Sequence, residues 1–559
     1  MRRFAVSLTL ALGLALGGCA SAPSDKPVAA PQMSAPQGPP KLILAISVDQ
    51  FSGDLFAQYR QRFSGGLARL LGGAVFPAGY QSHAATETCP GHSTLLTGTR
   101  PARNGIIANN WFDPASRGDK PVYCAEDPRD PASSARDPVV SSYHLKVPTL
   151  GDLMKKANPA TRNVAVSAKD RAAVMMGGHN IDAAYWFKSG AFASFRGRAL
   201  SPVATSQNAG IAATLKTGAP ALAIPAWCAA ADHAVTVGKG SVGTGRFALE
   251  PGKPQQFVAS PRMDAATVDL AIGLTEELQL GRGDAIDVLS VGLSATDYVG
   301  HSTGTAGLEM CIQLAELDRT IGRLLAHLDA KGIDYVVVLS ADHGGLDTPE
   351  RLDAQALPRA ARVDNSLLPA ELSKAVTAKT GIAPTQGPLL IADGPFGDFY
   401  VSRTVPAAQR GAVVQALLGI VRAHPQVAAA FTAEEIHKTP LPTGNPQDWT
   451  LKERARASFD PARSGDVVIL LDRAITPIPL EMTGIYIATH GSAWDYDRRV
   501  PILFWRRGMT GFEQPHAVET IDIAPTLSAL IGLGVPDGTF DGRCLDLDPG
   551  AGNTCGVAE

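Results

Sequence analysis

The chain has 559 residues, of which 45% are hydrophobic and 18% charged. This composition is typical of a globular protein and excludes a largely disordered chain. The length suffices for one large α/β domain with insertions or for two to three domains. The formal net charge of −3 leaves no basic field that would bind a nucleic acid polymer.

The N-terminus has the features of an export signal. Two arginines precede an apolar run, Phe4 to Leu16, that is too short to span a membrane. The run leads into Gly-Gly-Cys19, which resembles the lipobox of bacterial lipoproteins and implies cleavage before Cys19 and lipidation of its thiol. We therefore expect a lipoprotein-type signal peptide (1–19), a flexible tether (20–40) and a periplasmic protein that contacts a membrane only through this anchor. An ordinary signal that is cut just beyond Cys19 is the alternative.

The first predicted element of the folded part is a buried strand. Residues 41–48 form a continuous apolar run, and Asp49 follows it directly. Such runs are typical of parallel strands covered on both faces. Asp49 would then lie at the carboxyl end of the strand, where open α/β sheets bind their ligands.

The segment Thr86-Glu-Thr-Cys-Pro-Gly-His-Ser-Thr94 predicts the start of a helix. Pro90 suits only a first helical turn, so Thr88 should lie at, or just before, the N-terminus. Free N–H groups and the helix dipole favour an anion there. The Thr88 hydroxyl is therefore a candidate nucleophile for a phosphoryl group, provided that something lowers its pKa. The alternative is that Thr88 or Cys89 merely caps the helix.

Strands and helices alternate through the rest of the chain. We predict helices at 63–73, 149–156, 263–280, 305–330 and 517–532, and strands at 163–167, 285–294, 334–340, 465–471 and 499–505. This order predicts an α/β fold, a doubly wound and mostly parallel sheet with helices on both faces. Weakly periodic stretches at about 190–262 and 346–395 read as inserted lobes. The domain would span 41–535, followed by a C-terminal segment, 536–559.

Six cysteines remain if Cys19 is lipidated, and they are Cys89, Cys124, Cys228, Cys311, Cys544 and Cys555. An even number in an exported chain makes disulfides an expectation. The best single pairing is Cys544 with Cys555, which closes a short loop. No Cys-x-x-Cys pair occurs, which argues against a thiolate zinc site.

Acids and histidines follow several of the predicted strands. Three carboxylates and three imidazoles belong to this set: Asp49, Asp297, His301, Asp342, His343 and His490. The carboxyl ends of parallel strands meet at one sheet edge, so these groups can gather there. Both residue types are normal zinc ligands. Two metal ions about 3.5–4 Å apart can hold the attacking and leaving oxygens of a phosphoryl transfer.

These motifs resemble those of a known family. In order they are Asp49, Thr88-Cys-Pro-Gly-His92, Asp297-x-x-x-His301, Asp342-His343-Gly-Gly and Thr489-His490-Gly. Over residues 40–535 they are similar to the alkaline phosphatase superfamily, in the branch of type I phosphodiesterases and nucleotide pyrophosphatases.

That resemblance implies a doubly wound sheet with two zinc ions at its edge. It implies that Asp297, His301 and His490 hold one ion, and that Asp49, Asp342, His343 and the Thr88 oxygen hold the other. Thr88 would attack phosphorus, and water would then hydrolyse the phospho-threonine. Two displacements imply net retention of configuration at phosphorus.

A second resemblance bears on the substrate. Ser167-Ala-Lys-Asp-Arg171 is similar to a stretch of the phosphate-irrepressible alkaline phosphatases. In that subgroup an asparagine and a Lys-x-Arg pair clamp the phosphoryl oxygens, which implies these roles for Lys169, Arg171 and Asn109, with Asn110 as the fallback. A monoester presents more anionic oxygens than a diester and gains more from such cations. We therefore expect a monomeric alkaline phosphatase that acts on small phosphate monoesters.

Several alternatives stay open from the sequence. Lys169 and Arg171 can instead belong to a solvated loop, and the same site can serve a phosphodiesterase or nucleotide pyrophosphatase. A sulfatase is disfavoured, because that family's pattern is Cys-x-Pro-x-Arg and Pro90 here follows Cys89 directly. A non-catalytic, lipid-anchored binding protein would have no need of the full ligand set.

Overall fold

The computed structural model describes residues 38–355, 357, 359–484 and 486–556. The expected signal peptide, the lipidation site Cys19 and the tether up to residue 37 lie outside these residues. Within the described part, none of the helices is long and apolar enough to cross a bilayer.

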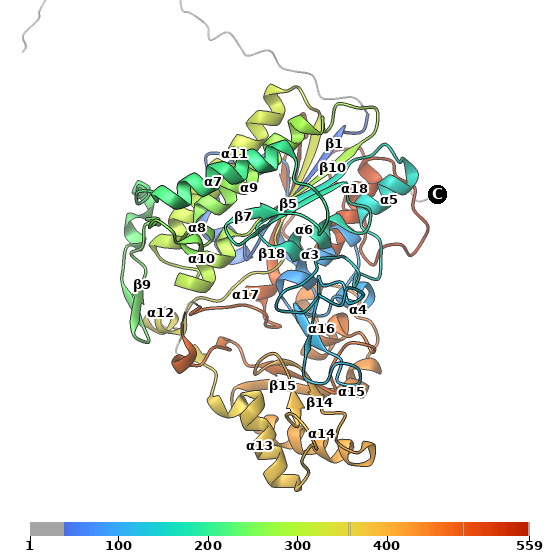
Figure 1. Cartoon of the computed structure of the whole chain (residues 1–559). Helices are drawn as coiled ribbons and strands as arrows, with labels where there is room; N and C mark the ends of the chain where they lie inside the picture. The colour runs from blue at the N-terminus through green and yellow to red at the C-terminus, as the bar shows by residue number, and fades with distance from the viewer. Residues whose placement is uncertain (1–37, 356, 358, 485, 557–559) are drawn as a thin grey trace, which may run out of the picture. The chain divides into compact units, whose positions relative to one another are not determined.

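A 10-stranded sheet forms the centre of the fold (Figure 1), in the order β19-β2-β18-β11-β1-β10-β5-β6-β7, with β20 paired to β2. Its strands are β1 (Leu42–Val48), β2 (Ala74–Tyr80), β5 (Asn163–Ser167), β6 (Ala183–Lys188), β7 (Ala191–Ala193), β10 (Asp287–Leu293), β11 (Tyr335–Ser340), β18 (Arg499–Arg506), β19 (Phe512–Glu513) and β20 (Val518–Glu519). The neighbours β11, β1, β10, β5 and β6 run parallel, whereas β18 and β7 run antiparallel to theirs. The predicted mostly parallel α/β sheet is confirmed.

Strand β1 shows why helices cover both faces. All seven of its residues are buried, and alternate residues point to opposite sides of a strand. Leu42 and Leu44 join one apolar cluster together with residues of α9 (Pro261–Glu277) and α11 (Leu308–Ala330). Ile43 joins a second cluster with residues of α3 (Thr88–Thr97), α5 (Leu150–Ala157) and α18 (Ile523–Leu530). The sheet is therefore doubly wound, as expected.

The register fixes where the strands end. Ser47 of β1 lies opposite Gly292 of β10 and Ser340 of β11, and Gly292 lies opposite Ser167 of β5. The carboxyl ends of these four strands therefore lie at one edge of the sheet. Asp49 continues this ladder, because its N–H donates to the carbonyl of Leu293 at 3.0 Å.

Some helices begin later or end earlier than predicted. The helix expected at 305–330 begins at Leu308, because Gly304 and Gly307 have φ values of 85° and 113°, outside the right-handed helical region. The helix expected at 63–73 is confined to α2 (Gly66–Leu70). The helix expected at 517–532 begins at Ile523, since Val518 and Glu519 pair with β2.

Other helices lie between the strands along the chain. They are α1 (Gly53–Tyr59), α4 (Pro101–Asn104), α6 (Asp170–Gly177), α7 (Pro202–Thr217), α8 (Pro254–Val258), α10 (Ala295–Thr303), α12 (Pro349–Ala354), α16 (Leu451–Ser458) and α17 (Asp495–Arg498). The stretch expected as a lobe at about 190–262 contains α7, α8 and the hairpin of β8 (Val235–Val237) and β9 (Gly240–Val242).

Four other strands form a second sheet, and they pair with one another and not with the described strands of the large sheet. The second sheet consists of β13 (Leu390–Ile391), β14 (Gly397–Val401), β16 (Val467–Leu471) and β15 (Val427–Thr432), with antiparallel neighbours. Helices α13 (Pro369–Thr380) and α14 (Ala407–Val421) share its apolar core, and α15 (Ala433–His437) follows β15 (Figure 1). The strand predicted at 465–471 thus forms, but in this sheet. The segment outside the large sheet continues from the insertion expected at about 346–395 through Leu471, because β14 pairs with β16 across a long stretch of sequence.

All six described cysteines form disulfides: Cys89–Cys124, Cys228–Cys311 and Cys544–Cys555. The pairing predicted between Cys544 and Cys555 is confirmed. The first of these bonds lies directly beside Thr88, and it links the start of α3 to the residue that follows β4 (Pro121–Tyr123).

Candidate active site

Thr88 is the first residue of α3, and Glu87 is the N-cap. The prediction from Pro90, which occupies the first turn, is confirmed. Every residue of α3 is buried, and Thr88 is only 1% exposed. The Thr88 hydroxyl thus lies at a buried helix N-terminus, where the helix dipole favours a negative charge.

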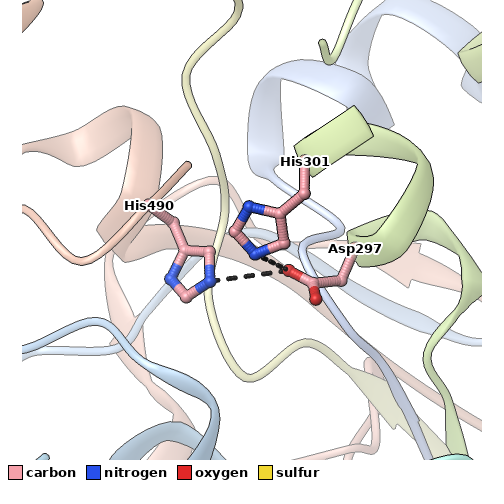
Figure 2. Close-up of side chains that lie close together, drawn as sticks. All are labelled: Asp297, His301 and His490. Atoms are coloured by element: carbon pink, nitrogen blue, oxygen red, sulfur yellow. Dashed lines mark ion pairs between the residues drawn. The ribbon is translucent and has the colours of Figure 1, made fainter. Parts of the chain in front are cut away.

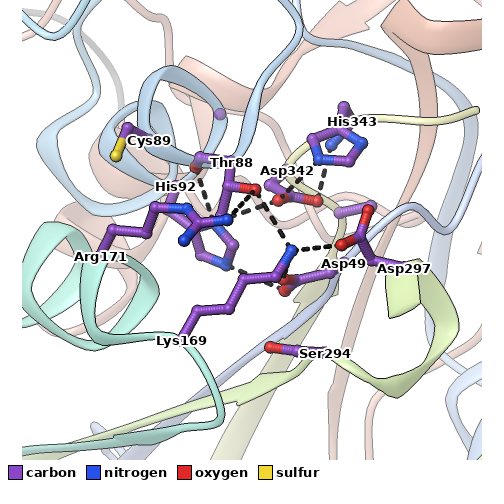
Figure 3. A network of polar contacts seen from close by, with 12 residues as sticks. Asp49, Thr88, Cys89, His92, Lys169, Arg171, Ser294, Asp297, Asp342 and His343 are labelled. Carbon is purple, nitrogen blue, oxygen red and sulfur yellow. Dashed lines mark hydrogen bonds and ion pairs between the residues drawn. The ribbon is translucent and has the colours of Figure 1, made fainter. Parts of the chain in front are cut away.

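Two cations point at the Thr88 hydroxyl (Figure 3). Lys169 Nζ donates to Thr88 Oγ1 at 3.3 Å and Arg171 Nη2 donates to it at 3.4 Å. Lys169 is the N-cap of α6, which packs against α3, and Arg171 is in its first turn. Lys169 is 3% exposed, so it does not belong to a solvated loop.

The Lys169 ammonium also lies between two carboxylates. Its Nζ is 2.9 Å from Asp49 Oδ2 and 2.5 Å from Asp297 Oδ2. Burial disfavours the charged amine, but Asp297 and Asp49 outweigh burial and raise the pKa of Lys169 above its usual range. The two carboxylates therefore favour the charged form of Lys169 at the sheet edge.

One group of possible metal ligands is the outer cluster, which we define as Asp297, His301 and His490 (Figure 2). Their Nε2 atoms lie 3.3 Å (His301) and 3.5 Å (His490) from Asp297 Oδ1. Asp297 and His301 are four residues apart on α10, which places them on one helix face. The side chains of His301 and His490 are 12% and 7% exposed.

Backbone carbonyls fix the tautomers of these two histidines. His301 Nδ1 lies 2.9 Å from the carbonyl of Ala488, and His490 Nδ1 lies 2.8 Å from that of Thr86. A carbonyl only accepts, so each Nδ1 must carry the proton. With the proton on Nδ1, the Nε2 atom of each ring faces Asp297, and a histidine that binds a metal commonly has this arrangement.

The inner cluster, defined as Asp49, His92, Asp342 and His343, is fully buried. His343 Nε2 lies 3.1 Å from Asp342 Oδ2, and His92 Nε2 lies 3.3 Å from Asp49 Oδ1 (Figure 3). His343 Nδ1 donates to the carbonyl of Gly344 at 2.8 Å. The rings of His343 and His490 stack with centroids 3.5 Å apart, so the inner and outer clusters are in direct contact.

The pKa values of the two imidazoles in the inner cluster are raised above the usual value for histidine. Burial disfavours a charged imidazole, but Asp342 and Asp49 together raise the pKa of His92 to about 10. Burial likewise opposes a charge on His343, and Asp342 raises the pKa of that ring. The inner cluster is therefore a pocket of concentrated negative charge that attracts protons and, by the same field, cations.

The donor chemistry of both clusters fits metal ions. The ligand atoms of Asp297, His301 and His490 lie within 4.8 Å of one another, and so do those of Asp49, His92 and Asp342. Lys169 pairs with Asp49 and Asp297, whereas Asp342 pairs with the imidazoles of His92 and His343, and buried carboxylates are costly unless cations compensate them. Oxygen and imidazole donors without thiolates suit zinc among the common metals.

Asn109 is tied to both neighbours of Thr88. Its Oδ1 accepts from the N–H of Cys89 at 2.8 Å, and its N–H donates to Glu87 Oε2 at 2.6 Å. Asn110 Nδ2 donates instead to Asp393 Oδ2 at 3.2 Å, away from the clusters. Of the two asparagines considered from the sequence, Asn109 is the one that lies beside the candidate nucleophile.

Two polar residues of the site had no assigned role in the sequence analysis. His92 follows Thr88 by four residues, and that helical spacing was a usable signal for a shared face. Gln50 contacts carboxylates of both clusters, and nothing in its sequence position beyond adjacency to Asp49 indicated this.

Residues 43–492 match the family model described as type I phosphodiesterase / nucleotide pyrophosphatase. The chain belongs to this family.

Within it, the chain is similar to proteins named as alkaline phosphatases. It is 53% identical to alkaline phosphatase PhoK of a Sphingomonas species over 520 residues, covering 92% of this chain and 93% of PhoK. It is 49% identical to alkaline phosphatase PhoD of Zymomonas mobilis, covering 92% and 90%. A crystal structure of alkaline phosphatase PafA superposes with a TM-score of 0.79 at 25% identity, covering 92% of this chain and 99% of that one.

Proposed function

We propose that this protein is an alkaline phosphatase that hydrolyses small phosphate monoesters through a phospho-threonine at a two-zinc site. The observation that carries the proposal is the Thr88 hydroxyl. It heads a buried helix, two cations lie within 3.4 Å of it, and the ligand clusters lie beside it. The similarity to PhoK and PhoD supports the same activity.

In this proposal the residues of the chain orient the phosphoryl group. Thr88 Oγ1 attacks phosphorus, forms the new P–O bond and expels the alcohol, and a water molecule then cleaves the phospho-threonine. Lys169 and Arg171 bind phosphoryl oxygens, and the positive end of the α3 dipole favours the remaining negative charge. Asn109 Oδ1 accepts from the Cys89 N–H, and the Asn109 side-chain amide would donate a further hydrogen bond to the phosphoryl group.

The outer cluster would hold one zinc ion, and Asp49, Asp342 and His343 with Thr88 Oγ1 would hold the other. Zinc bound there supplies a lowered pKa for the threonine hydroxyl and for water, together with charge to stabilise the leaving oxygen. The carbonyls of Ala488, Thr86 and Gly344 keep the three imidazoles in the required tautomer.

A phosphodiesterase or nucleotide pyrophosphatase is the second candidate, because the family model covers such enzymes. Lys169 and Arg171 favour the monoesterase. Both reach the same Thr88 oxygen, so they surround the point of attack with two positive charges. A monoester has an extra anionic oxygen that these charges can bind, whereas a diester has an alkyl group in that place.

We further propose that the protein is exported to the periplasm, is anchored by a lipid on Cys19 and acts as a monomer. The lipobox-like sequence supports the anchor, and three disulfides support an oxidising compartment.

A substrate panel tests the proposed activity. Zinc-loaded protein should hydrolyse an aryl phosphate monoester with a higher kcat/KM than the matched alkyl aryl diester and the aryl sulfate. The double variant Lys169→Ala with Arg171→Ala should lower monoester kcat/KM by about 10²-fold or more, and diester kcat/KM far less.

Lys188→Ala with Arg196→Ala is the matched control, because these two cations are more than half exposed and pair with surface aspartates. It should leave all three rates unchanged. A diester preference that survives the loss of Lys169 and Arg171 would contradict the monoesterase and support the second candidate.

A further inference from the structure

Gln50 connects the two ligand clusters. Its side-chain Nε2 donates to Asp297 Oδ1 of the outer cluster at 3.2 Å. Its backbone N–H donates to Asp342 Oδ1 of the inner cluster at 3.1 Å. One residue thus holds a carboxylate of each cluster, through two different parts of its structure, and it is only 1% exposed.

The backbone of Gln50 is in an uncommon conformation. Its φ is 64°, in the left-handed region that residues other than glycine, asparagine and aspartate rarely adopt. Such a conformation persists only where the surroundings impose it. The left-handed turn directly after β1 directs the N–H of Gln50 to Asp342 while the side chain reaches Asp297.

Two glycines make room for the Gln50 amide, and each belongs to one of the metal-binding motifs. A Cβ on Gly300, one residue before His301, would lie 1.6 Å from Gln50 Oε1. A Cβ on Gly345, at the end of Asp342-His343-Gly-Gly345, would lie 2.8 Å from Gln50 Cδ. Neither glycine has a positive φ, so space and not backbone conformation accounts for them.

We propose that Gln50 is a positioning residue whose side-chain amide sets the orientation of Asp297, while its backbone N–H holds Asp342 of the neighbouring zinc subsite. This rests on the proposed two-zinc function. Because Asp297 Oδ1 is the oxygen nearest both imidazoles of the outer cluster, the Gln50 amide fixes the carboxylate rotamer that faces them. Hydrogen bonds to a ligating carboxylate commonly control metal affinity in this way.

The two contacts of Gln50 can be separated by mutation. Gln50→Met keeps the length of the side chain and the backbone N–H but loses the amide donor. It should weaken zinc binding by the outer cluster and leave the inner cluster unchanged. A general loss of packing would affect both.

Zinc affinity is measured by competition with a chromogenic chelator in two backgrounds. His343→Ala leaves only the outer cluster complete, and there Gln50→Met should lower the affinity about 10–100-fold. His490→Ala leaves only the inner cluster complete, and there Gln50→Met should have no effect. Equal losses in both backgrounds, or no loss in either, would overturn the positioning role.

Asn163→Leu is the matched control. Asn163 is also a fully buried amide packed against a glycine, Gly151, but it lies at the opposite end of β5. It should lower the melting temperature without changing zinc affinity in either background.

A second readout needs no metal. Gly300→Ala should destabilise the metal-free protein, because the new methyl group collides with Gln50. The double variant Gly300→Ala with Gln50→Ala should recover the melting temperature but not the zinc affinity of the outer cluster. Destabilisation that persists in the double variant would show that the glycine does not serve Gln50. A wild-type protein that binds no zinc would refute the two-zinc function itself. The melting temperatures of the Gly300 variants do not depend on zinc, so they test the packing of Gln50 independently.

Discussion

The large sheet and the small four-stranded sheet both have an apolar core, and the two ligand clusters lie at the edge of the large one. Strands β11, β1, β10 and β5 run parallel, so Asp342, Asp49, Asp297 and Lys169 all follow strand ends at one edge. In the small sheet, β14 and β15 run antiparallel to β16. Residues that follow those strands are distributed over opposite edges.

This difference indicates how the fold makes a site. In a parallel sheet the residues that follow neighbouring strands lie at one edge, whereas neighbouring antiparallel strands end at opposite edges. Substitutions at the edge of the large sheet should therefore change rates, and substitutions in the small sheet should change stability. Each of the following variants tests one side of that contrast.

The largest effect is expected at Thr88. Thr88→Ala removes the attacking oxygen and should lower monoester kcat by about 10³-fold or more, while both zinc ions stay bound. Thr432 is the matched threonine beside the small sheet, because it caps α15 through its hydroxyl. Thr432→Ala should cost about 1 kcal/mol of unfolding free energy and leave kcat unchanged. Retention of most activity by Thr88→Ala would mean that Thr88 acts only at the helix start.

The next effect is expected at the outer cluster. His490→Ala should remove one of two bound zinc ions and lower kcat/KM by about 10²-fold or more, as measured by metal analysis and steady-state kinetics. Chelation of the wild-type protein should abolish activity, and added zinc should restore it. His424, whose ring contacts Ser366 near the small sheet, is the control, and His424→Ala should retain both zinc ions. Full activity in chelated protein would rule out the two-metal site.

A core substitution at the small sheet should lower stability and leave the rate unchanged. Leu417 of α14 is fully buried against that sheet. Leu417→Ala should lower the free energy of unfolding by about 2–4 kcal/mol, measured by denaturant titration, with kcat/KM unchanged below the transition. Leu96→Ala is the matched substitution in α3, which packs against the large sheet. It should reduce both the free energy of unfolding and kcat/KM. A rate loss in Leu417→Ala would break the contrast.

The smallest effect concerns pH. Burial raises the pKa of Asp398 in β14 to about 6, although the Gly465 N–H donates to its Oδ1 and opposes the shift. The folded state then holds this proton more tightly than the unfolded state, whose pKa is near 3.8. This contribution to stability is complete below the unfolded pKa and is lost as pH rises to about 6.

Asp398→Asn keeps the acceptor oxygen and removes the charge. It should therefore stabilise the protein by about 1–2 kcal/mol at pH 8 and by much less at pH 4.5. Denaturant titrations at the two pH values measure this, and kcat/KM serves as the control. Equal effects at both pH values would contradict the assignment to this carboxyl group.

The sequence predicted a large part of this architecture for identifiable reasons. Pro90 limits the start of α3 to the residues around Thr88, and an apolar run before Asp49 is typical of a buried parallel strand. Parallel strands share their carboxyl edge, so the acids that follow them were expected to meet. These inferences needed only local stereochemistry and strand periodicity.

Other features depend on contacts between distant residues. The run at 465–471 resembles β1 in composition, and only its pairing with β14 and β15 places it in the small sheet. The pairings Cys89–Cys124 and Cys228–Cys311 likewise follow from proximity in space.

By itself, the sequence determined the candidate nucleophile, the zinc-type donors and the mostly parallel sheet, because these follow from residue type and local spacing. Only the tertiary structure decided that Lys169 is buried against Thr88, that His92 joins the inner cluster and that Gln50 spans both clusters. The physical reason is that each of these roles depends on the distance between side chains on elements that are far apart in the chain. Such distances are set by sheet register and helix packing, which no local pattern specifies.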